Sequence, residues 1–256
     1  MVRVGRLSTR CIRDTISRAY LTDAKRCPRI TTIKISNDYP EVFEFDSNDS
    51  VSAQTWWNTL GDKWVRVNLI TDALGNTVGG SRSSRDLTGG ADRDVLAALR
   101  AESDVILIGG ETVRSEPDCI PRKGDVVIVS NSGNIPLSAI SRARGRITVL
   151  HGRNGNPPSP MNGVVLKEFT GGAIIKAVRA LGYKKIVCEG GPSLAHKLVE
   201  AGVVDEWCQT LSPKLGLRIP ELVAADFGGV LRNVAHDDEG YRYLRRSRNG
   251  APLIST

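Results

Sequence analysis

The most informative stretch of the sequence is Ile186-Val187-Cys188-Glu189-Gly190-Gly191-Pro192-Ser193-Leu194. Its apolar residues end abruptly at an acid, two glycines and a proline, and an amphipathic segment follows. The pattern predicts a buried strand that opens into the N-terminus of a helix. Glycines let a ligand approach the backbone closely, and a helix N-terminus favours an anion. The stretch therefore suggests a phosphate-bearing cofactor beside Glu189, although an ordinary strand-to-helix turn explains it equally well.

Strand-like and helix-like segments alternate along the chain from about residue 64. The expected strands are 65–71, 104–109, 125–129, 146–150, 164–166, 184–188, 205–211, 230–236 and 241–246. The expected helices are 88–100 with Thr88 as its N-cap, 111–115, 172–181 and 192–201. This alternation predicts a mainly parallel sheet with helices on both faces, and the last two strands predict an antiparallel edge. Ligands bind beyond the carboxyl ends of the strands in such sheets.

The N-terminal part differs from this regular body. We expect residues 1–62 to form an extension made of a basic head and a linker, 63–248 one domain, and 249–256 a tail. Residues 31–46 alternate enough for one short strand or a hairpin. The first thirty residues carry +6 of the net charge of +7, so the nearly neutral body is not expected to bind nucleic acid. The basic head is either a solvated tail or a contact for an anionic partner.

Composition excludes several classes of protein. There is no apolar run of membrane-spanning length and no signal-peptide core, so we expect a cytoplasmic protein that does not enter a membrane. The five cysteines are scattered without a C-x-x-C pair, and the three histidines share no ligand spacing, so no metal site or disulfide framework is expected. The arginines near the C-terminus, Arg245, Arg246 and Arg248, are expected to lie at an exposed end.

Several segments, in this order, resemble one family of enzymes. They are Leu87-Thr88-Gly89-Gly90-Ala91, Leu99-Arg100, Asp104 to Arg114, Glu189 to Leu194, Val204-Asp205-Glu206 and Leu211-Ser212-Pro213. Together they are similar to the pyrimidine reductases, the C-terminal reductase domain of bacterial riboflavin-biosynthesis proteins, over about residues 64–247. The resemblance implies a dihydrofolate-reductase-like α/β fold, with a mainly parallel mixed sheet flanked by helices and antiparallel C-terminal strands. The zinc-deaminase signature, H-x-E followed by P-C-x-x-C, is missing from the chain.

The resemblance also implies a reaction and its residues. Such homodimeric enzymes use NADPH to reduce the ribosyl group of a phosphoribosylamino-pyrimidine, a small-molecule substrate, to ribityl. The residues that match cofactor contacts are Thr112, Glu116, Asn131, Ser132, Gly190, Gly191, Pro192, Ser193 and Leu194. The residues that match substrate contacts are Ser84, Arg100, Glu189 and, for the substrate phosphate, Lys123, or Arg122 if the loop register shifts by one. Glu189 is the candidate catalytic residue for moving a proton, with a role in binding alone as the alternative.

One departure from the family concerns the turn after the first strand of the domain. The family usually carries Ser-Leu-Asp-Gly there, and this chain has Asp72-Ala73-Leu74-Gly75, so Leu74 stands where the acid is expected. Either Asp72 substitutes for that acid through a shifted turn, or the substrate differs. A dihydrofolate or pteridine reductase and a noncatalytic nucleotide-binding homologue are therefore the alternative functions.

Overall fold

The computed structural model describes residues 32–36, 43–46, 60–222 and 224–248. All of them belong to one compact unit, residues 31–256. The basic head, most of the linker and the tail expected at 249–256 lie outside the described residues. Within the described residues, no helix is long and apolar enough to cross a membrane.

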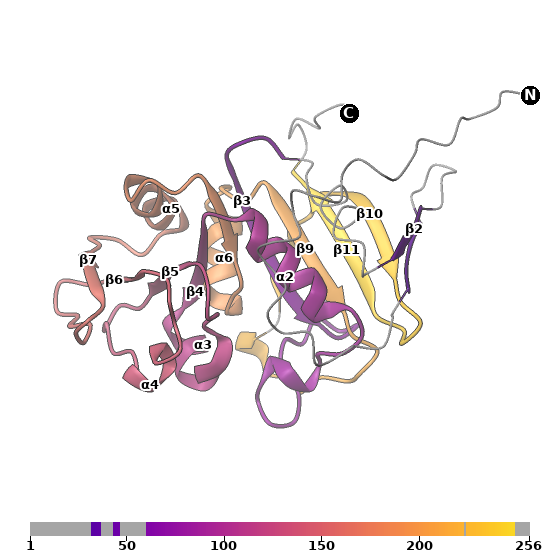
Figure 1. The fold of residues 1–256 in the computed structure, drawn as a ribbon, viewed down its shortest axis with the longest axis horizontal. Helices are drawn as coiled ribbons and strands as arrows, with labels where there is room; N and C mark the ends of the chain where they lie inside the picture. Colours follow the sequence, from indigo (N-terminus) through magenta and orange to yellow (C-terminus); the bar gives the residue numbers. More distant parts are fainter. Residues whose placement is uncertain (1–31, 37–42, 47–59, 223, 249–256) are drawn as a thin grey trace, which may run out of the picture. The chain divides into compact units, whose positions relative to one another are not determined.

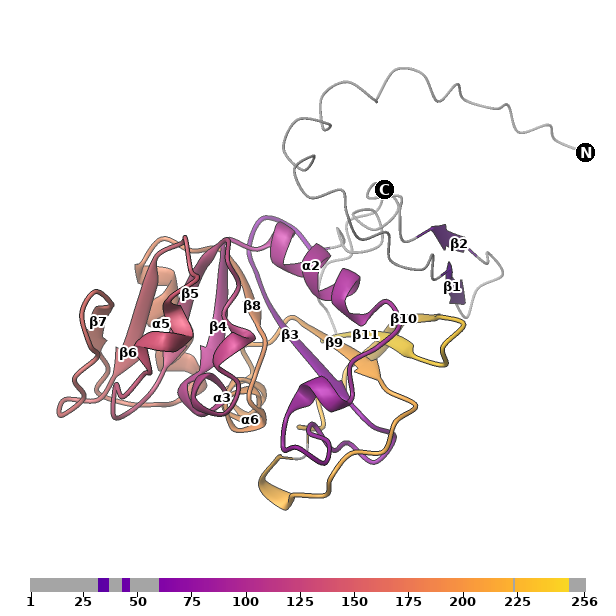
Figure 2. The same ribbon diagram turned by 60° about the horizontal axis from the view of Figure 1, so that its bottom comes forward.

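In the described residues, eleven strands form one sheet in the order β2-β1-β10-β11-β9-β3-β8-β4-β5-β6-β7 (Figures 1 and 2). In chain order they are β1 (Thr32–Ser36), β2 (Phe43–Asp46), β3 (Trp64–Thr71), β4 (Val105–Gly109), β5 (Asp125–Val129), β6 (Ile147–His151), β7 (Asn162–Val165), β8 (Lys185–Cys188), β9 (Glu206–Leu211), β10 (Val230–His236) and β11 (Arg242–Ser247). The seven strands from β9 to β7 are parallel, and β11, β10, β1 and β2 pair antiparallel. This is the mainly parallel mixed sheet with antiparallel C-terminal strands that the resemblance implies. Of the two alternatives for 31–46, one short strand or a hairpin, the structure has the antiparallel pair β1 and β2.

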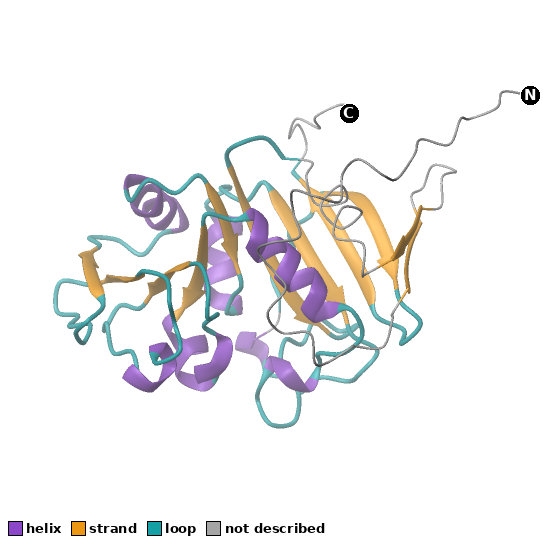
Figure 3. Ribbon diagram, in the orientation of Figure 1, coloured by secondary structure: helices purple, strands orange, loops and turns teal. Residues whose placement is uncertain are grey.

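Helices cover both faces of the parallel part of the sheet (Figure 3). The α-helices are α2 (Asp92–Glu102), α3 (Gly110–Ser115), α4 (Leu137–Ile140), α5 (Gly171–Ala180) and α6 (Pro192–Glu200). The described part of the chain also forms three short 3-10 helices, η1 (Ser84–Asp86), η2 (Pro117–Cys119) and η3 (Pro220–Leu222). Apolar residues of α2, α3 and α4 share one core cluster, and those of α5 and α6 share another. Because side chains alternate across each strand, one strand supplies residues to both clusters.

Strands β3 and β8 separate part-way along the sheet. Their register runs from Trp64 with Lys185 to Val67 with Cys188, where β8 ends. Beyond that point the chain turns towards β4, since the Glu189 N–H donates to the Leu107 carbonyl at 3.0 Å. Strand β3 continues alongside β9 as far as Thr71, and Figure 2 shows β3 passing between its two neighbours. The last four residues of β3 therefore extend past the end of β8.

The start of α2 corrects the expected N-cap. Thr88 does not cap the helix; the N-cap is Ala91, which makes no side-chain capping bond, and the helix begins at Asp92. The helix begins later than expected because of tertiary contacts. The Ala91 N–H donates to Asp237 Oδ2 at 3.1 Å and to Tyr243 Oη at 2.9 Å. Gly90, with a φ of +52°, makes the turn before it. Asp237, in the turn after β10, and Tyr243 of β11 thus supply the partners that a local cap would otherwise provide.

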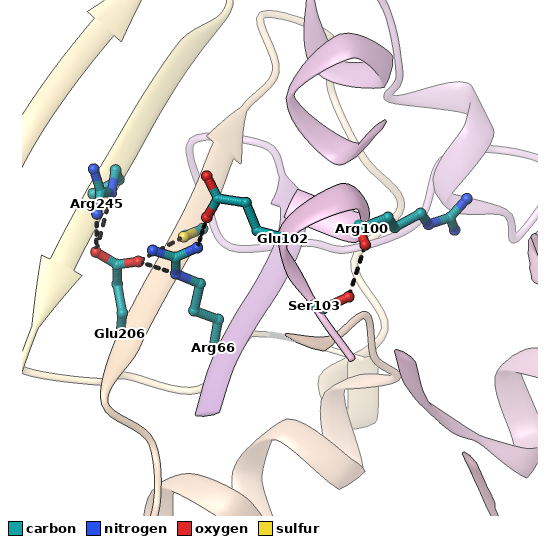
Figure 4. Close-up of polar contacts among 7 residues, drawn as sticks. Arg66, Arg100, Glu102, Ser103, Glu206 and Arg245 are labelled. Carbon is teal, nitrogen blue, oxygen red and sulfur yellow. Dashed lines mark hydrogen bonds and ion pairs between the residues drawn. The ribbon is translucent and has the colours of Figure 1, made fainter. Parts of the chain in front are cut away.

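The expectation of an exposed C-terminal arginine cluster is wrong for Arg245. Arg245 is buried in β11 and donates to Oε1 of the buried Glu206 (Figure 4). The other oxygen of Glu206 accepts from Arg66 Nε at 2.5 Å, and Arg66 also donates to Glu102 at 2.8 Å. Two guanidinium groups and two carboxylates therefore balance one another inside the fold. Such pairing is what lets charged groups remain buried.

Candidate functional site

An ion pair joins α2 to the end of β8. Arg100 Nε donates to Glu189 Oε1 at 2.6 Å, and Arg100 Nη2 donates to Oε2 at 2.5 Å. The resulting bidentate geometry is the strong form of an arginine–carboxylate contact. Burial lowers the pKa of Arg100, but the hydrogen bonds and charge of Glu189 outweigh burial and leave that pKa raised. Two residues expected to bind substrate are thus held together as one ion pair at the carboxyl end of β8.

The Gly190–Gly191 segment lies against the end of β4. The Gly109 N–H donates to the Gly190 carbonyl at 2.6 Å. A β-carbon on Gly109 would lie 3.3 Å from the Gly191 nitrogen, and one on Gly191 would lie 2.9 Å from Thr112 Oγ1. Gly190 has a φ of +109°, and its peptide bond to Gly191 is cis. The structure therefore brings Thr112 beside Gly191, and a side chain at Gly109 or Gly191 would be crowded by its neighbours.

Helix α6 begins directly after this glycine pair. Gly191 is its N-cap, no side chain caps it, and Pro192 occupies the first turn. Pro192 and Leu194 are buried, whereas Ser193 is exposed. Backbone N–H groups at an uncapped helix start bind anions, aided by the helix dipole. The residues here suit a cofactor phosphate: the start is uncapped, and glycines leave the backbone open to close approach.

Ser84 and Glu116 lie in contact with each other. Both the backbone N–H and the hydroxyl of Ser84 donate to the Glu116 carboxylate, at 2.6 and 3.0 Å. Ser84 opens η1, and Glu116 joins α3 to η2. The carboxylate therefore fixes the Gly/Ser-rich loop of residues 75–88, which follows β3, to the end of α3. An expected substrate contact and an expected cofactor contact meet at this junction.

Asn131 and Ser132 follow β5 at the same edge of the sheet. The Asn131 carbonyl accepts from the Gly152 N–H at 2.9 Å, which connects the ends of β5 and β6. The Ser132 hydroxyl lies 3.4 Å from that of Ser130 and accepts from the Asn134 N–H at 3.2 Å. Both expected cofactor contacts are exposed. The expected cofactor residues therefore follow the carboxyl ends of three adjacent strands, β8, β4 and β5.

Lys123 and Arg122 do not lie at the carboxyl ends of the strands. Both are exposed and precede Asp125, the first residue of β5, so they lie near the amino ends of the strands. Their segment begins at Cys119, whose carbonyl accepts from Arg100 Nη2 at 3.3 Å. Burial raises the pKa of the Cys119 thiol to about 12, so this neighbour of the ion pair is a neutral thiol rather than a nucleophile.

The carboxylate of Asp72 is used within the protein. Asp72 is only 1% exposed and accepts from the backbone N–H groups of Leu74, Asn76 and Gly216 at 2.8 to 2.9 Å. The Asn76 side-chain amide adds a fourth hydrogen bond at 2.7 Å. Four donors fill the acceptor capacity of a carboxylate. Asp72 therefore shapes the turn, while Leu74, where the family carries its acid, is 71% exposed.

Sequence reasoning missed Asn68. It lies in β3 and is 9% exposed, and its Oδ1 is buried without a hydrogen-bond partner. A signal was present, because Arg66 and Asn68 are polar residues spaced by two in a strand that is apolar from Trp64 to Ile70 apart from them. Polar residues at that spacing share one face of a strand. Among the described residues, no group of three or more His, Cys, Asp or Glu is placed to hold a metal ion.

Comparison with known proteins identifies the domain. The model of the RibD C-terminal domain family matches residues 63–216, more than half of the chain. A search of curated proteins found no match.

Solved structures share the fold at low sequence identity. A pyrimidine reductase-like protein from Corynebacterium diphtheriae has a TM-score of 0.58 and 20% identity, over 76% of this chain and 93% of that one. A diaminohydroxyphosphoribosylaminopyrimidine deaminase/5-amino-6-(5-phosphoribosylamino)uracil reductase from Thermotoga maritima has a TM-score of 0.61 and 15% identity, over 73% of this chain and 57% of that one. The riboflavin biosynthesis reductase Rib7 of Saccharomyces cerevisiae has a TM-score of 0.55 and 14% identity, over 72% and 89%. This chain thus spans little more than half of the two-activity protein.

Proposed function

The chain belongs to the RibD C-terminal domain family, and from this membership we propose that it is an NADPH-dependent reductase of riboflavin synthesis. Its substrate would be a 5-amino-6-(5-phosphoribosylamino)uracil-type compound, whose ribosyl group becomes ribityl. The observation that carries the proposal is the Arg100–Glu189 pair beside the Gly190–Gly191 segment. That arrangement puts an acceptor for pyrimidine N–H groups next to a backbone suited to phosphate.

The cofactor would bind along the ends of β8, β4 and β5. The uncapped start of α6, with Gly191, would hold its phosphate, and Thr112 would lie beside it. Asn131, Ser132 and Glu116 would supply further polar contacts. NADPH, when bound, supplies the hydride, and the protein supplies orientation and electrostatics.

The substrate residues would position the pyrimidine and its sugar. Glu189 would accept hydrogen bonds from ring N–H groups while Arg100 holds its carboxylate in one orientation. Glu189 is the one acid proposed to touch the substrate, so it is also the residue proposed to move a proton. Ser84 would contact the substrate from the loop that Glu116 anchors. Lys123, or Arg122, would bind the sugar phosphate as it extends away from the cofactor.

The test is oxidation of NADPH by the purified protein with the phosphoribosylamino-pyrimidinedione, and with dihydrofolate in parallel. Turnover on the former alone supports the proposal, and turnover on dihydrofolate alone replaces it with a pteridine reductase. Binding of NADPH without turnover on either compound would favour the noncatalytic nucleotide-binding homologue. Glu189→Gln and Arg100→Ala should each lower a measured turnover, and if neither does, the site is wrongly assigned.

A further inference from the structure

Asn68 carries a hydrogen-bonding atom that the protein leaves unused. Within the described part of the chain, Asn68 Oδ1 is the one buried side-chain oxygen or nitrogen without a hydrogen-bond partner. An unsatisfied buried polar atom costs about 1–3 kcal/mol, so such atoms are rare. Asn76, a second buried asparagine, shows the ordinary case, because its side-chain amide donates to Asp72 at 2.7 Å. A group that donates to Oδ1 would remove the penalty at Asn68.

The position of Asn68 is where β3 leaves β8. The last paired residue of β3 on that side is Val67, opposite Cys188, so Asn68 is the first residue beyond the end of β8. Glu189, the next residue after Cys188, is the carboxylate of the ion pair with Arg100. Asn68 therefore lies in the part of the sheet where the candidate substrate residues begin.

The side chain of Asn68 faces the side of the sheet that α2 covers. Trp64 of β3 shares the core cluster of Leu99 in α2, and Arg66 bonds Glu102 of the same helix. Alternation along the strand puts Asn68 on that face as well. The next residue, Leu69, faces the other way: its side chain lies 3.0 Å from where a β-carbon on Gly190 would be. Successive residues of β3 thus separate the α2 side, with Arg100, from the glycine segment proposed for the cofactor.

We propose that Asn68 is a substrate-binding residue, whose Oδ1 accepts a hydrogen bond from an O–H or N–H group of the bound substrate. A phosphoribosylamino-pyrimidine offers both kinds of donor, in its sugar hydroxyls and its ring and amine N–H groups. The inference rests on the proposed function for the identity of the substrate. Its structural part, that Oδ1 is reserved for a ligand, can be tested on the free protein.

The first experiment compares two leucine substitutions in the absence of ligand. Asn68→Leu removes an unsatisfied buried atom at similar volume, and we expect the midpoint of thermal unfolding to rise by about 2–4 °C. Asn76→Leu is the matched control, because it removes a hydrogen-bonded amide, and we expect its midpoint to fall. If Asn68→Leu lowers the midpoint as Asn76→Leu does, Oδ1 has a partner within the protein and the inference is overturned.

The second experiment measures binding of the ribitylamino-pyrimidinedione phosphate, the product of the proposed reaction, by calorimetry. For Asn68→Leu and for the smaller Asn68→Ala we expect about tenfold weaker product binding, with NADPH binding changed less than about twofold. Unchanged product binding would refute the inference, as would a loss of NADPH binding instead, which would assign Oδ1 to the cofactor. If the wild-type protein binds NADPH but not the product, the proposed function fails first, and the substrate assignment of Asn68 falls with it.

Discussion

Arg100 and Glu102 lie two residues apart in the last turn of α2, yet their side chains enter separate ion pairs. Arg100 reaches Glu189 at the end of β8, and Glu102 reaches the buried Arg66 of β3. Figure 4 shows the two side chains leaving the helix in different directions. The same helical turn therefore helps to anchor the buried ion network and to orient the candidate site.

Loss of the shared carboxylate should destabilise the fold strongly. Glu206→Gln would leave Arg66 and Arg245 buried with Glu102 as the remaining acid of the network. We expect the free energy of unfolding to fall by about 3–5 kcal/mol, the usual result of breaking a buried pair. Urea unfolding followed by circular dichroism measures it. Glu102→Gln is the control and should cost about 1–3 kcal/mol, since Glu102 pairs with Arg66 alone; equal losses would contradict the central role of Glu206.

Bidentate geometry, and not charge alone, should matter at Arg100. Arg100→Lys keeps the positive charge but cannot hold both oxygens of Glu189 in one plane. We expect kcat/KM for the pyrimidine substrate to fall about 10–100-fold, the range found when a positioning contact is lost. Arg146→Lys is a matched control, because Arg146 is exposed and lies 3.9 Å from the partly buried Asp125, outside the candidate site. An Arg100→Lys enzyme as active as the control would show that charge suffices.

Asp72 should make stability depend on pH in the acid range. Burial alone raises the pKa of Asp72, but hydrogen bonds from Asn76, Gly216 and Leu74 outweigh it and leave that pKa lowered. The folded state therefore favours the ionised form, and the stabilisation is present above about pH 4, the unfolded value, and is lost as the pH falls through the folded pKa.

Asp72→Asn tests this dependence. Its side-chain NH₂ cannot accept hydrogen bonds from the turn, so at pH 7 we expect a loss of about 1–3 kcal/mol in the free energy of unfolding. The difference from wild type should shrink below about pH 4. Urea unfolding across this range decides the matter, and a deficit that stays constant down to pH 2 or so would show that ionisation of Asp72 is not the cause.

Restoring an acid at Leu74 should change little. Leu74 is 71% exposed, so Leu74→Asp should alter the free energy of unfolding by no more than about 0.5 kcal/mol. We expect kcat/KM for the pyrimidine substrate to change less than about threefold, because Asp72 already shapes the turn. Leu74→Asn separates charge from size. A tenfold or greater gain with aspartate alone would show that the displaced acid limits activity.

Local pattern sufficed for most of the fold. The mostly apolar run located β3, which is buried along nearly all its length, and the amphipathic pattern located α5 and α6, because burial of one helix face imposes a period of 3.6 residues on the sequence. The start of α2 could not be found this way, since the partners of Ala91 are Asp237 and Tyr243, far along the chain. The burial of Arg245 was hidden for the same reason.

The candidate site shows a similar division. The glycines after β8 marked the place where the strand opens into a helix, and Glu189 followed from its position at the strand end. That Asp72 is fully used within the turn depends on Gly216, which is 144 residues away in sequence. Asn68 could be noticed in the sequence as a polar residue in a mostly apolar strand. That its Oδ1 lacks a hydrogen-bond partner depends on the assembled sheet.

The buried network also constrains how this protein can change over evolutionary time. A neutral residue at Arg66, Glu206 or Arg245 alone would leave an uncompensated charge in the interior. Compensated replacements by apolar residues of matching volume would be far better tolerated. Related sequences should therefore change these three residues together. Such covariation would reveal, from sequences alone, that β3, β9 and β11 are neighbours.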